Sequence, residues 1–329
     1  MTIKDIAKLA GVSTAAVSRY FHNGYISEGK REAIRKVVEE TGYLPSMQAQ
    51  TLRTKKTNLI GVIIPRIDSG SIARVVEGIM EKADENNYQL LLANTMNNPE
   101  KEIEYLSVFH DKQVDGVILL GTLITDEHKR LISNMAVPIV VVGQKLEGFD
   151  SVYHDDYKAE YDTTKFLIEK GCKKLVYIGV DERDKAVGED RYAGYRDAVI
   201  DAGLDECADR RVVGDFEYSD GYNGMKSLYE KYDEIDGVVA ATDTVASGAM
   251  KYLYEKGVRI PEDVMIVGQG DSVTARIVTP ELTTVKYFYE ESGRTATRIL
   301  LEKINSSDED VPVRMMRLGY EMIEGGTTK

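Results

Sequence analysis

The sequence contains no tryptophan, two cysteines, four histidines and seven prolines among its 329 residues. The two cysteines, Cys172 and Cys207, cannot build a disulfide framework and lack the spacing of metal ligands. No apolar run approaches the roughly 18 residues that span a membrane. The charged residues within the N-terminal apolar pattern do not fit a secretory leader. These absences predict a cytoplasmic protein that binds no metal and crosses no membrane.

Motifs of catalysis and of cofactor binding are missing as well. The sequence has no P-loop, no G-x-S-x-G turn and no H-E-x-x-H pair. The glycines of "GQGDS" lack the third glycine of a dinucleotide fingerprint. In the cluster His154-Asp155-Asp156, one histidine beside carboxylates is more typical of a structural role. The sequence therefore predicts no catalytic residue, no cofactor and no enzyme activity.

Positive charge is scarce outside the N-terminal part of the chain, whose formal net charge is −13. Residues 1–56 contain ten Lys or Arg against five Asp or Glu, whereas the remaining 273 residues contain 32 against 50. A cationic front on an anionic body predicts that a polyanion contacts the front alone.

The first 45 residues contain residues that typically begin and end short helices. Thr2 and Asp5 have the spacing of a capping box, Gly11 supplies a tight turn, and Ser13 can cap a second helix. Gly42 stands where a third helix would end. Three short helices, the first two joined by a glycine turn, are typical of a helix-turn-helix, although other small helical bundles share the pattern.

From Leu59 onward, short apolar runs such as "LIGVII" alternate with longer amphipathic stretches, and the alternation restarts near "KKLVYIGV". Continuous apolar strands between helices indicate parallel sheets covered on both faces. Two such sets predict two doubly wound lobes. In such folds ligands bind beyond the carboxyl ends of the strands, here in the cleft between the lobes.

The whole chain resembles the LacI/GalR family of bacterial repressors. The resemblance is carried, in the family's order, by "IKDIAKLAGVSTAAVSRYFHN", "TGYLPSMQAQTLRTKKTNLIGVIIP", "DRYAGYRDAV", "ATDTVASGAMKYL" and "TPELTTVKY". It implies an α/β protein with an N-terminal helix-turn-helix domain and a periplasmic-binding-protein-like body of two doubly wound parallel-sheet lobes. Within the family, "VVVGQ", "YHDDY" and "VGQGDS" are similar to segments of regulators of sucrose or related sugar operons.

The family order also implies the domain boundaries. The expected parts are a DNA-binding domain at 1–45, a hinge helix or linker at 46–57 and a body at 58–329. The body would contain an N-lobe at about 58–156 and 288–312 and a C-lobe at about 157–287 and 313–329. The implied function is repression of a carbohydrate-utilisation operon. The implied partners are palindromic double-stranded operator DNA, a second copy of the chain, and a small sugar or sugar-phosphate effector. The protein would associate with the nucleoid when bound to DNA.

The resemblance assigns the DNA-binding residues. Thr14, Ala15 and Arg19 match base-reading positions of the recognition helix, and Ser18 matches a phosphate-contacting one. An arginine can donate two hydrogen bonds to a guanine edge, and methyl groups can contact a thymine methyl. In the hinge, Leu52 matches the leucine that wedges into the minor groove, and the small side chain of Ala49 would permit close pairing of two hinge helices.

The effector site is implied in the same way. Arg191 matches the arginine that anchors sugar hydroxyls, and Phe216 matches an aromatic position that stacks on a sugar ring. Asp243 and Asp271 follow strand ends and could accept from hydroxyls, with helix N-caps as the alternative for both. Gln144 stands where a strand-end aspartate is common in the family. A core aromatic is the alternative for Phe216.

The sequence leaves two alternative functions open. A global catabolite regulator would use a phosphoprotein co-repressor in place of a sugar. A cytoplasmic sugar-binding or sugar-modifying protein would share the body fold. The sequence also leaves open the operator, the sugar, and whether the ligand induces or co-represses.

Overall fold

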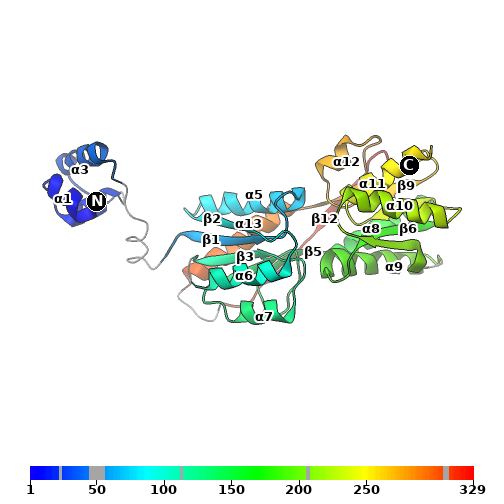
Figure 1. Cartoon of the computed structure of the whole chain (residues 1–329), viewed down its shortest axis with the longest axis horizontal. Coiled ribbons are helices and arrows are strands. Elements are labelled where there is room, and N and C mark those ends of the chain that lie inside the picture. Colours follow the sequence, from blue (N-terminus) through cyan, green and yellow to red (C-terminus); the bar gives the residue numbers. More distant parts are fainter. Residues whose placement is uncertain (22–23, 44–55, 112–113, 205–207, 307–310) are drawn as a thin grey trace. The chain divides into compact units, whose positions relative to one another are not determined.

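The computed structural model describes residues 1–21, 24–43, 56–111, 114–204, 208–306 and 311–329. The chain divides into two compact units, Met1–Asn58 and Leu59–Lys329, which we call the front unit and the body (Figure 1). No helix in the described ranges is long and apolar enough to cross a membrane.

The front unit consists of three helices, α1 (Ile3–Leu9), α2 (Thr14–Phe21) and α3 (Glu28–Thr41). Thr2 and Asp5 form the predicted capping box at the start of α1. Gly11, in the turn between α1 and α2, has φ +64°, a left-handed conformation that favours glycine. Each helix contributes one fully buried aliphatic side chain to a small common core: Ile6, Val17 and Ile34.

The first lobe of the body contains a parallel sheet of six strands in the order β11-β5-β4-β3-β1-β2. Its elements are β1 (Leu59–Ile64), α5 (Gly70–Asp84), β2 (Gln89–Asn94), α6 (Pro99–His110), β3 (Gly116–Leu120), α7 (Asp126–Ser133), β4 (Ile139–Val142), β5 (Ser151–His154), α13 (Tyr289–Asn305) and β11 (Met315–Leu318). Val62 and Ile64 face the core with α5 and α13, whereas Ile63 faces the core with α6. Buried side chains therefore point to both faces of the sheet, as continuous apolar strands require.

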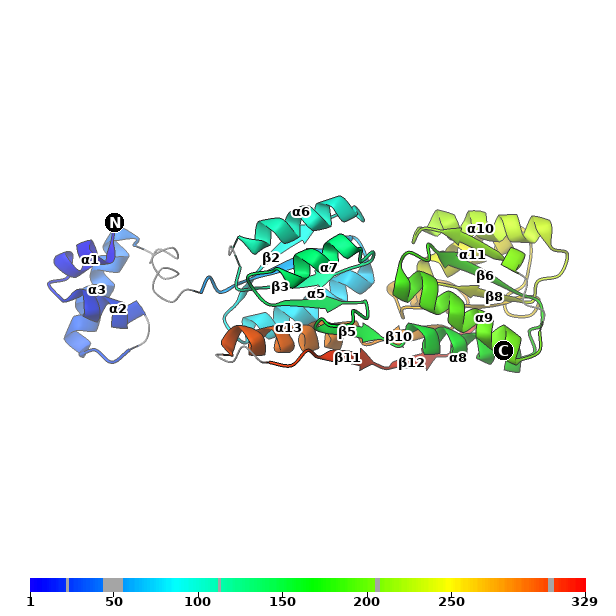
Figure 2. The ribbon, with the colours of Figure 1, turned by 90° about the horizontal axis from the view of Figure 1, so that it is seen from below.

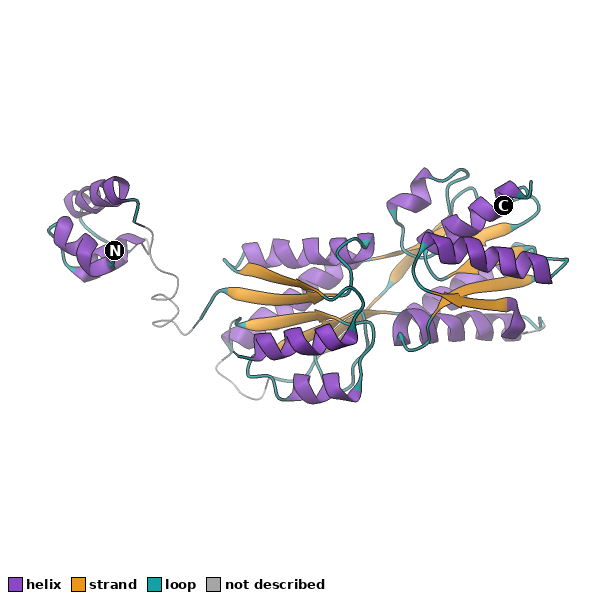
Figure 3. Cartoon of the chain, viewed as in Figure 1, coloured by secondary structure: helices purple, strands orange, loops and turns teal. Residues whose placement is uncertain are grey.

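The second lobe repeats this design around a parallel sheet of four strands in the order β7-β6-β8-β9. Its elements are α8 (Asp156–Glu169), β6 (Leu175–Val180), α9 (Arg191–Asp201), β7 (Arg211–Gly214), α10 (Tyr218–Lys231), β8 (Gly237–Ala240), α11 (Asp243–Glu255), β9 (Met265–Val267) and α12 (Val273–Ile277). A π-helical turn, Lys185–Asp190, leads into α9, and a short 3-10 turn, Ala208–Arg210, leads into β7. The predicted pair of doubly wound lobes is confirmed, and Figure 3 shows helices on either side of both sheets.

The chain passes between the lobes at three places, from β5 to α8, from β10 (Thr284–Tyr287) to α13, and from β11 to β12 (Tyr320–Ile323). Strands β10 and β12 pair antiparallel at this junction, as Figure 2 shows. One expected boundary differs from the structure. Residues 313–329 were assigned to the C-lobe as a block, but β11 pairs in parallel with β5 in the sheet of the first lobe. Residue-by-residue apolarity does not reveal which sheet an edge strand joins, because the pairing is tertiary.

Candidate functional site

Helix α2 of the front unit presents the side chains assigned to DNA. Thr14, Ala15 and Arg19 are exposed and Ser18 is half-buried, while Ala16 and Val17 face the core of the unit. Within the described ranges no carboxylate forms an ion pair with Arg19. An exposed helix face with one arginine, a hydroxyl and small side chains can enter the major groove of DNA. Ala49 and Leu52, assigned to the hinge, lie outside the described residues.

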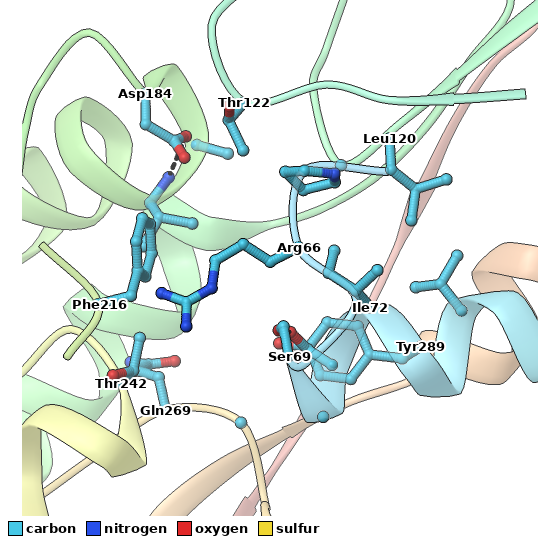
Figure 4. A pocket seen from close by; sticks show the side chains of 18 of the residues that line it. Arg66, Ser69, Ile72, Leu120, Thr122, Asp184, Phe216, Thr242, Gln269 and Tyr289 are labelled. Atoms are coloured by element: carbon cyan, nitrogen blue, oxygen red, sulfur yellow. Dashed lines mark hydrogen bonds between the residues drawn. The ribbon is translucent and has the colours of Figure 1, made fainter. Parts of the chain in front are cut away.

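A cavity of about 420 Å³ separates the two lobes of the body. Its walls come from the residues that follow the carboxyl ends of the strands, including Arg66 after β1, Gln144 after β4, Phe216 after β7 and Gln269 after β9. The first turns of α5 and α11 also line it. This is the position at which doubly wound folds bind their ligands. Figure 4 shows Arg66 extending from the first lobe towards Phe216 of the second.

Arg191 lines the cavity but is almost fully buried, and its guanidinium is bonded within the protein. Its Nε donates to Asp156 Oδ1 at 2.8 Å, its Nη2 lies 2.6 Å from the same oxygen, and its Nη1 donates to the carbonyl of Ala241. The guanidinium carbon lies 5.0 Å from the centre of the Tyr287 ring. Arg191 therefore neutralises Asp156 and holds it against the cavity.

Asp243 also lines the cavity, and it is not a helix cap. Thr242 caps α11 by accepting from the N–H of Val245, whereas Asp243 accepts from the N–H of Ser272 and from the hydroxyl of Thr284. Burial raises the pKa of Asp243. Its carboxylate is thus anchored at the second lobe's wall by groups from two other segments.

Asp271 is not among the residues that line the cavity. Its carboxylate pairs with Arg276 on α12, with Oδ2 2.9 Å from Nη2, and the N-cap of α12 is Ser272. Neither expected role, ligand contact or helix cap, matches this arrangement. The reason is local: Asp271 has φ +44°, and its side chain lies beside the guanidinium five residues later.

The cavity-lining residues of the two lobes touch directly at Gln144. Its Nε2 donates to Asp184 Oδ1 of the second lobe at 2.8 Å and to the carbonyl of Thr122 at 3.2 Å (Figure 4). Burial raises the pKa of the Asp184 carboxyl. Phe216 is half-buried and lines the cavity. Of the five assigned ligand residues, the structure brings together Arg191, Asp243, Phe216 and Gln144.

A chain of hydrogen bonds between buried polar side chains lies at the junction of the lobes. Tyr287 donates to Gln269 Oε1 at 2.7 Å, and Gln269 Nε2 donates to Glu160 Oε2 at 3.0 Å. Burial raises the pKa of Glu160 to about 8. Removal from water disfavours the carboxylate anion, so this pKa favours the protonated form of Glu160 below about pH 8.

Several cavity residues were missed by reasoning from the sequence: Arg66, Arg74, Asp156, Asp184, Glu217 and Gln269. A usable signal existed for Arg66 and Gln269, since both are among the first polar residues after an apolar strand. The cluster His154-Asp155-Asp156 is divided, because His154 and Asp156 line the cavity whereas Asp155 caps α8 and pairs with Arg317. Among the described residues no group of His, Cys, Asp and Glu is arranged to hold a metal ion.

Comparison with known proteins agrees with this architecture. Residues 2–46 match the family described as bacterial regulatory proteins, lacI family, and residues 164–328 match the periplasmic binding protein-like domain. The sucrose operon repressor of Staphylococcus xylosus is 34% identical over 305 residues, 92% of each chain.

Two solved structures extend the comparison. The transcriptional regulator CelR–cellobiose complex is 28% identical, covers 99% of both chains and superposes with a TM-score of 0.76. The lac repressor dimer bound to operator and an anti-inducer is 21% identical and covers 100% of this chain and 99% of that one, with a TM-score of 0.90, which shows the shared fold. These relatives match both the helix-turn-helix and the two-lobed body along almost the whole chain. The protein therefore belongs to the LacI family of DNA-binding bacterial transcription regulators, which are not enzymes.

Proposed function

We propose that this protein represses a carbohydrate-utilisation operon in the bacterial cytoplasm and is released from its operator by a sugar bound between the lobes. The cavity carries this proposal. Carboxylates such as Asp184 and Asp243 offer acceptors for hydroxyl groups, and the ring of Phe216 offers a surface for the apolar face of a sugar. The sucrose operon repressor and the cellobiose complex among its relatives support the same class of ligand.

The coupling between ligand binding in the cavity and operator affinity depends on contacts of the ligand with both lobes. A sugar that touches both walls stabilises one arrangement of the lobes over another. The family resemblance implies a hinge helix at 46–57, which includes Ala49 and Leu52, and an isolated helix of this length is marginal in water. A change in the lobes then orders or melts this hinge, and a coupling of about 1–3 kcal/mol alters operator affinity roughly 5–150-fold.

The function is tested with an operator selected from random duplex DNA by the full-length protein. Fluorescence anisotropy on that operator, with a panel of mono- and disaccharides, should reveal at least one sugar that weakens binding. Tightening by a protein partner, with no response to any sugar, would favour a co-repressed catabolite regulator. Chemical conversion of a panel sugar would contradict the assignment as a regulator.

Arg19→Ala should lower affinity for the selected operator by about 1–3 kcal/mol and relax the base preference at one position of each half-site. The reason is the loss of a bidentate contact to a base edge. Lys36→Ala, which removes an exposed cation on α3, is the matched control. It should lower the affinity for operator and for random DNA slightly and by the same factor. An equal loss for Arg19→Ala on operator and random DNA would show that Arg19 contacts only phosphates.

Dimerisation is supported by exposed apolar side chains of α5, β2 and α12. Met80 of α5 and Leu91 and Leu92 of the edge strand β2 are exposed, as are Val273 and Ile277 of α12. The two lobes meet where the Nη2 of Arg74 on α5 donates to the carbonyl of Gly270 ahead of α12. Exposed apolar patches and open sheet edges of this kind indicate an isologous contact, and a two-fold operator requires a two-fold protein.

Sedimentation of the full-length chain should therefore give twice the monomer mass of 36.7 kDa. Leu91→Glu and Val273→Glu should each shift the chain towards the monomer, because a charge would be buried in the contact. Val213→Glu places the same charge at an exposed apolar position on β7 and should leave the dimer intact. A monomeric wild-type chain at micromolar concentration, or a tetramer, would refute this proposal.

A further inference from the structure

Arg66, which extends into the cavity from the first lobe, is already neutralised. Arg66 donates from Nε to Asp68 Oδ1 at 2.9 Å and from Nη2 to Asp68 Oδ2 at 2.8 Å, a bidentate pair within the first lobe. Its Nη1 forms an ion pair with Glu217, which belongs to the second lobe and follows Phe216. Both edges of the guanidinium are thus occupied by carboxylates, one from each lobe.

The guanidinium groups of the other two arginines of the cavity wall also form hydrogen bonds within the protein. Arg191 is bonded to Asp156 and to a main-chain carbonyl, as described above. Arg74 donates from Nη2 to the carbonyl of Gly270 at 2.6 Å and from Nη1 to that of Asp271 at 3.4 Å, and it lies over the ring of Tyr289. No lysine is found among the described residues that line the cavity.

Acidic residues outnumber arginines on the cavity wall. Three arginines face five acidic residues, Asp68, Asp156, Asp184, Glu217 and Asp243. A phosphate monoester carries about −1.5 to −2 charges at pH 7. To pair with Arg66 or Arg191, it would have to displace a carboxylate from the guanidinium. To pair with Arg74, it would have to displace two main-chain carbonyls. In each case it would lie beside carboxylates that repel it. Uncharged hydroxyl groups meet no such cost, because they donate to the carboxylates as they stand.

The first turn of α5 is a part of the wall that favours an anion. Ser69, Gly70 and Ser71 line the cavity, and the start of a helix carries partial positive charge. Asp68 stands immediately before this turn, however, and with Glu217 it places negative charge next to the same amides. The local charge around α5 is therefore already balanced without a ligand.

From this arrangement we infer that the cavity selects an uncharged, hydroxyl-rich ligand over its phosphate ester, and that Glu217 sets the selection by occupying Arg66 from the opposite lobe. The inference rests on the proposed sugar-effector function and narrows it to unphosphorylated sugars. Glu217 is a specificity-determining residue in this scheme, since its removal leaves Nη1 of Arg66 free for a ligand oxygen.

The test compares matched pairs on the full-length protein by isothermal titration and thermal shift: glucose with glucose 6-phosphate, fructose with fructose 1-phosphate, and sucrose with sucrose 6-phosphate, with inorganic phosphate alone as a further probe. We expect at least one free sugar to bind and its phosphate ester to bind about tenfold more weakly or worse. Inorganic phosphate should give no shift.

Glu217→Gln should lower the ratio of sugar to phosphate-ester affinity by about fivefold or more, because it removes the negative charge that pairs with Arg66 while keeping a side chain of the same shape. Asp68→Asn should move the ratio in the same direction. Asp215→Asn is the matched control: this exposed carboxylate lies in the same loop, outside the cavity wall, and should leave the ratio unchanged.

Two outcomes would overturn the inference, and they are distinguishable. A phosphate ester that binds wild-type protein as tightly as its parent sugar, or a ratio unaffected by Glu217→Gln, would refute the charge selection while leaving a sugar effector in place. Binding of neither member of any pair, with operator binding intact, would contradict the proposed sugar-effector function and with it this inference.

Discussion

Arg191→Ala is expected to lower the free energy of unfolding of the body by about 3–5 kcal/mol. The side chains of Arg191 and Asp156 are 5% and 6% exposed, so the substitution leaves a carboxylate buried without its cation. It also removes the donor to the carbonyl of Ala241. Urea unfolding of the full-length chain followed by circular dichroism measures the loss, since the chain has no tryptophan to report by fluorescence.

Two variants make this expectation specific. Arg183→Ala removes an arginine that is 76% exposed and paired with Asp181 nearby in the sequence, and it should change stability little. Arg191→Met combined with Asp156→Leu removes both charges and should restore most of the stability lost in Arg191→Ala. Equal effects of Arg191→Ala and Arg183→Ala would show that the buried pair contributes nothing. A lost sugar response in Arg191→Ala is accordingly interpretable only beside its measured stability.

The stability of the body is expected to fall as the pH rises towards 8, through Glu102 on α6. Burial raises the pKa of Glu102 from 4.5 to about 8, and its Oε1 has no hydrogen-bond partner among the described residues. The folded state therefore binds this proton more tightly than the unfolded state. The resulting stabilisation is fully present below pH 4.5 and is lost as the pH passes about 8. Its size is on the order of 5 kcal/mol.

Glu102→Gln isolates this effect, because glutamine is uncharged at every pH. The variant should gain stability relative to wild type as the pH is raised, with the difference smallest near pH 4.5. Glu104→Gln, an exposed position on the same helix, should show no such trend. Glu160, whose pKa burial also raises to about 8, adds a dependence of the same sign. If the difference in the free energy of unfolding between wild type and Glu102→Gln did not change with pH, Glu102 would not be a buried neutral carboxyl group.

Much of the site's location was predictable, because it depends on local pattern. Polar residues that follow apolar strands mark the ligand edge of a parallel sheet, and this rule predicts Asp243 on the cavity wall, while the family resemblance adds Gln144 and Phe216. The same rule placed Asp271 there wrongly. Proximity to a strand end does not decide where a side chain points, and here Arg276 draws the carboxylate away.

The pairings that give the cavity its charge were not predictable. Arg66 and Glu217 are 151 positions apart in the sequence and come from different lobes. Arg191 and Asp156 are 35 positions apart, and neither residue type signals that it will be buried with a partner. Such contacts depend on how two separately wound sheets are joined, and a single sequence contains no local trace of that.

The sequence by itself determined the helix caps and glycine turn of the front unit, the two sets of parallel strands and the family. Each of these depends on interactions between near neighbours or on a repeated apolar pattern, which are legible in order along the chain. Only the tertiary structure decided that β11 joins the first sheet, that Arg191 is committed to Asp156, and that Glu217 reaches across to Arg66. These outcomes are long-range because burial and charge pairing act through space, between groups that the fold alone brings within a few ångströms.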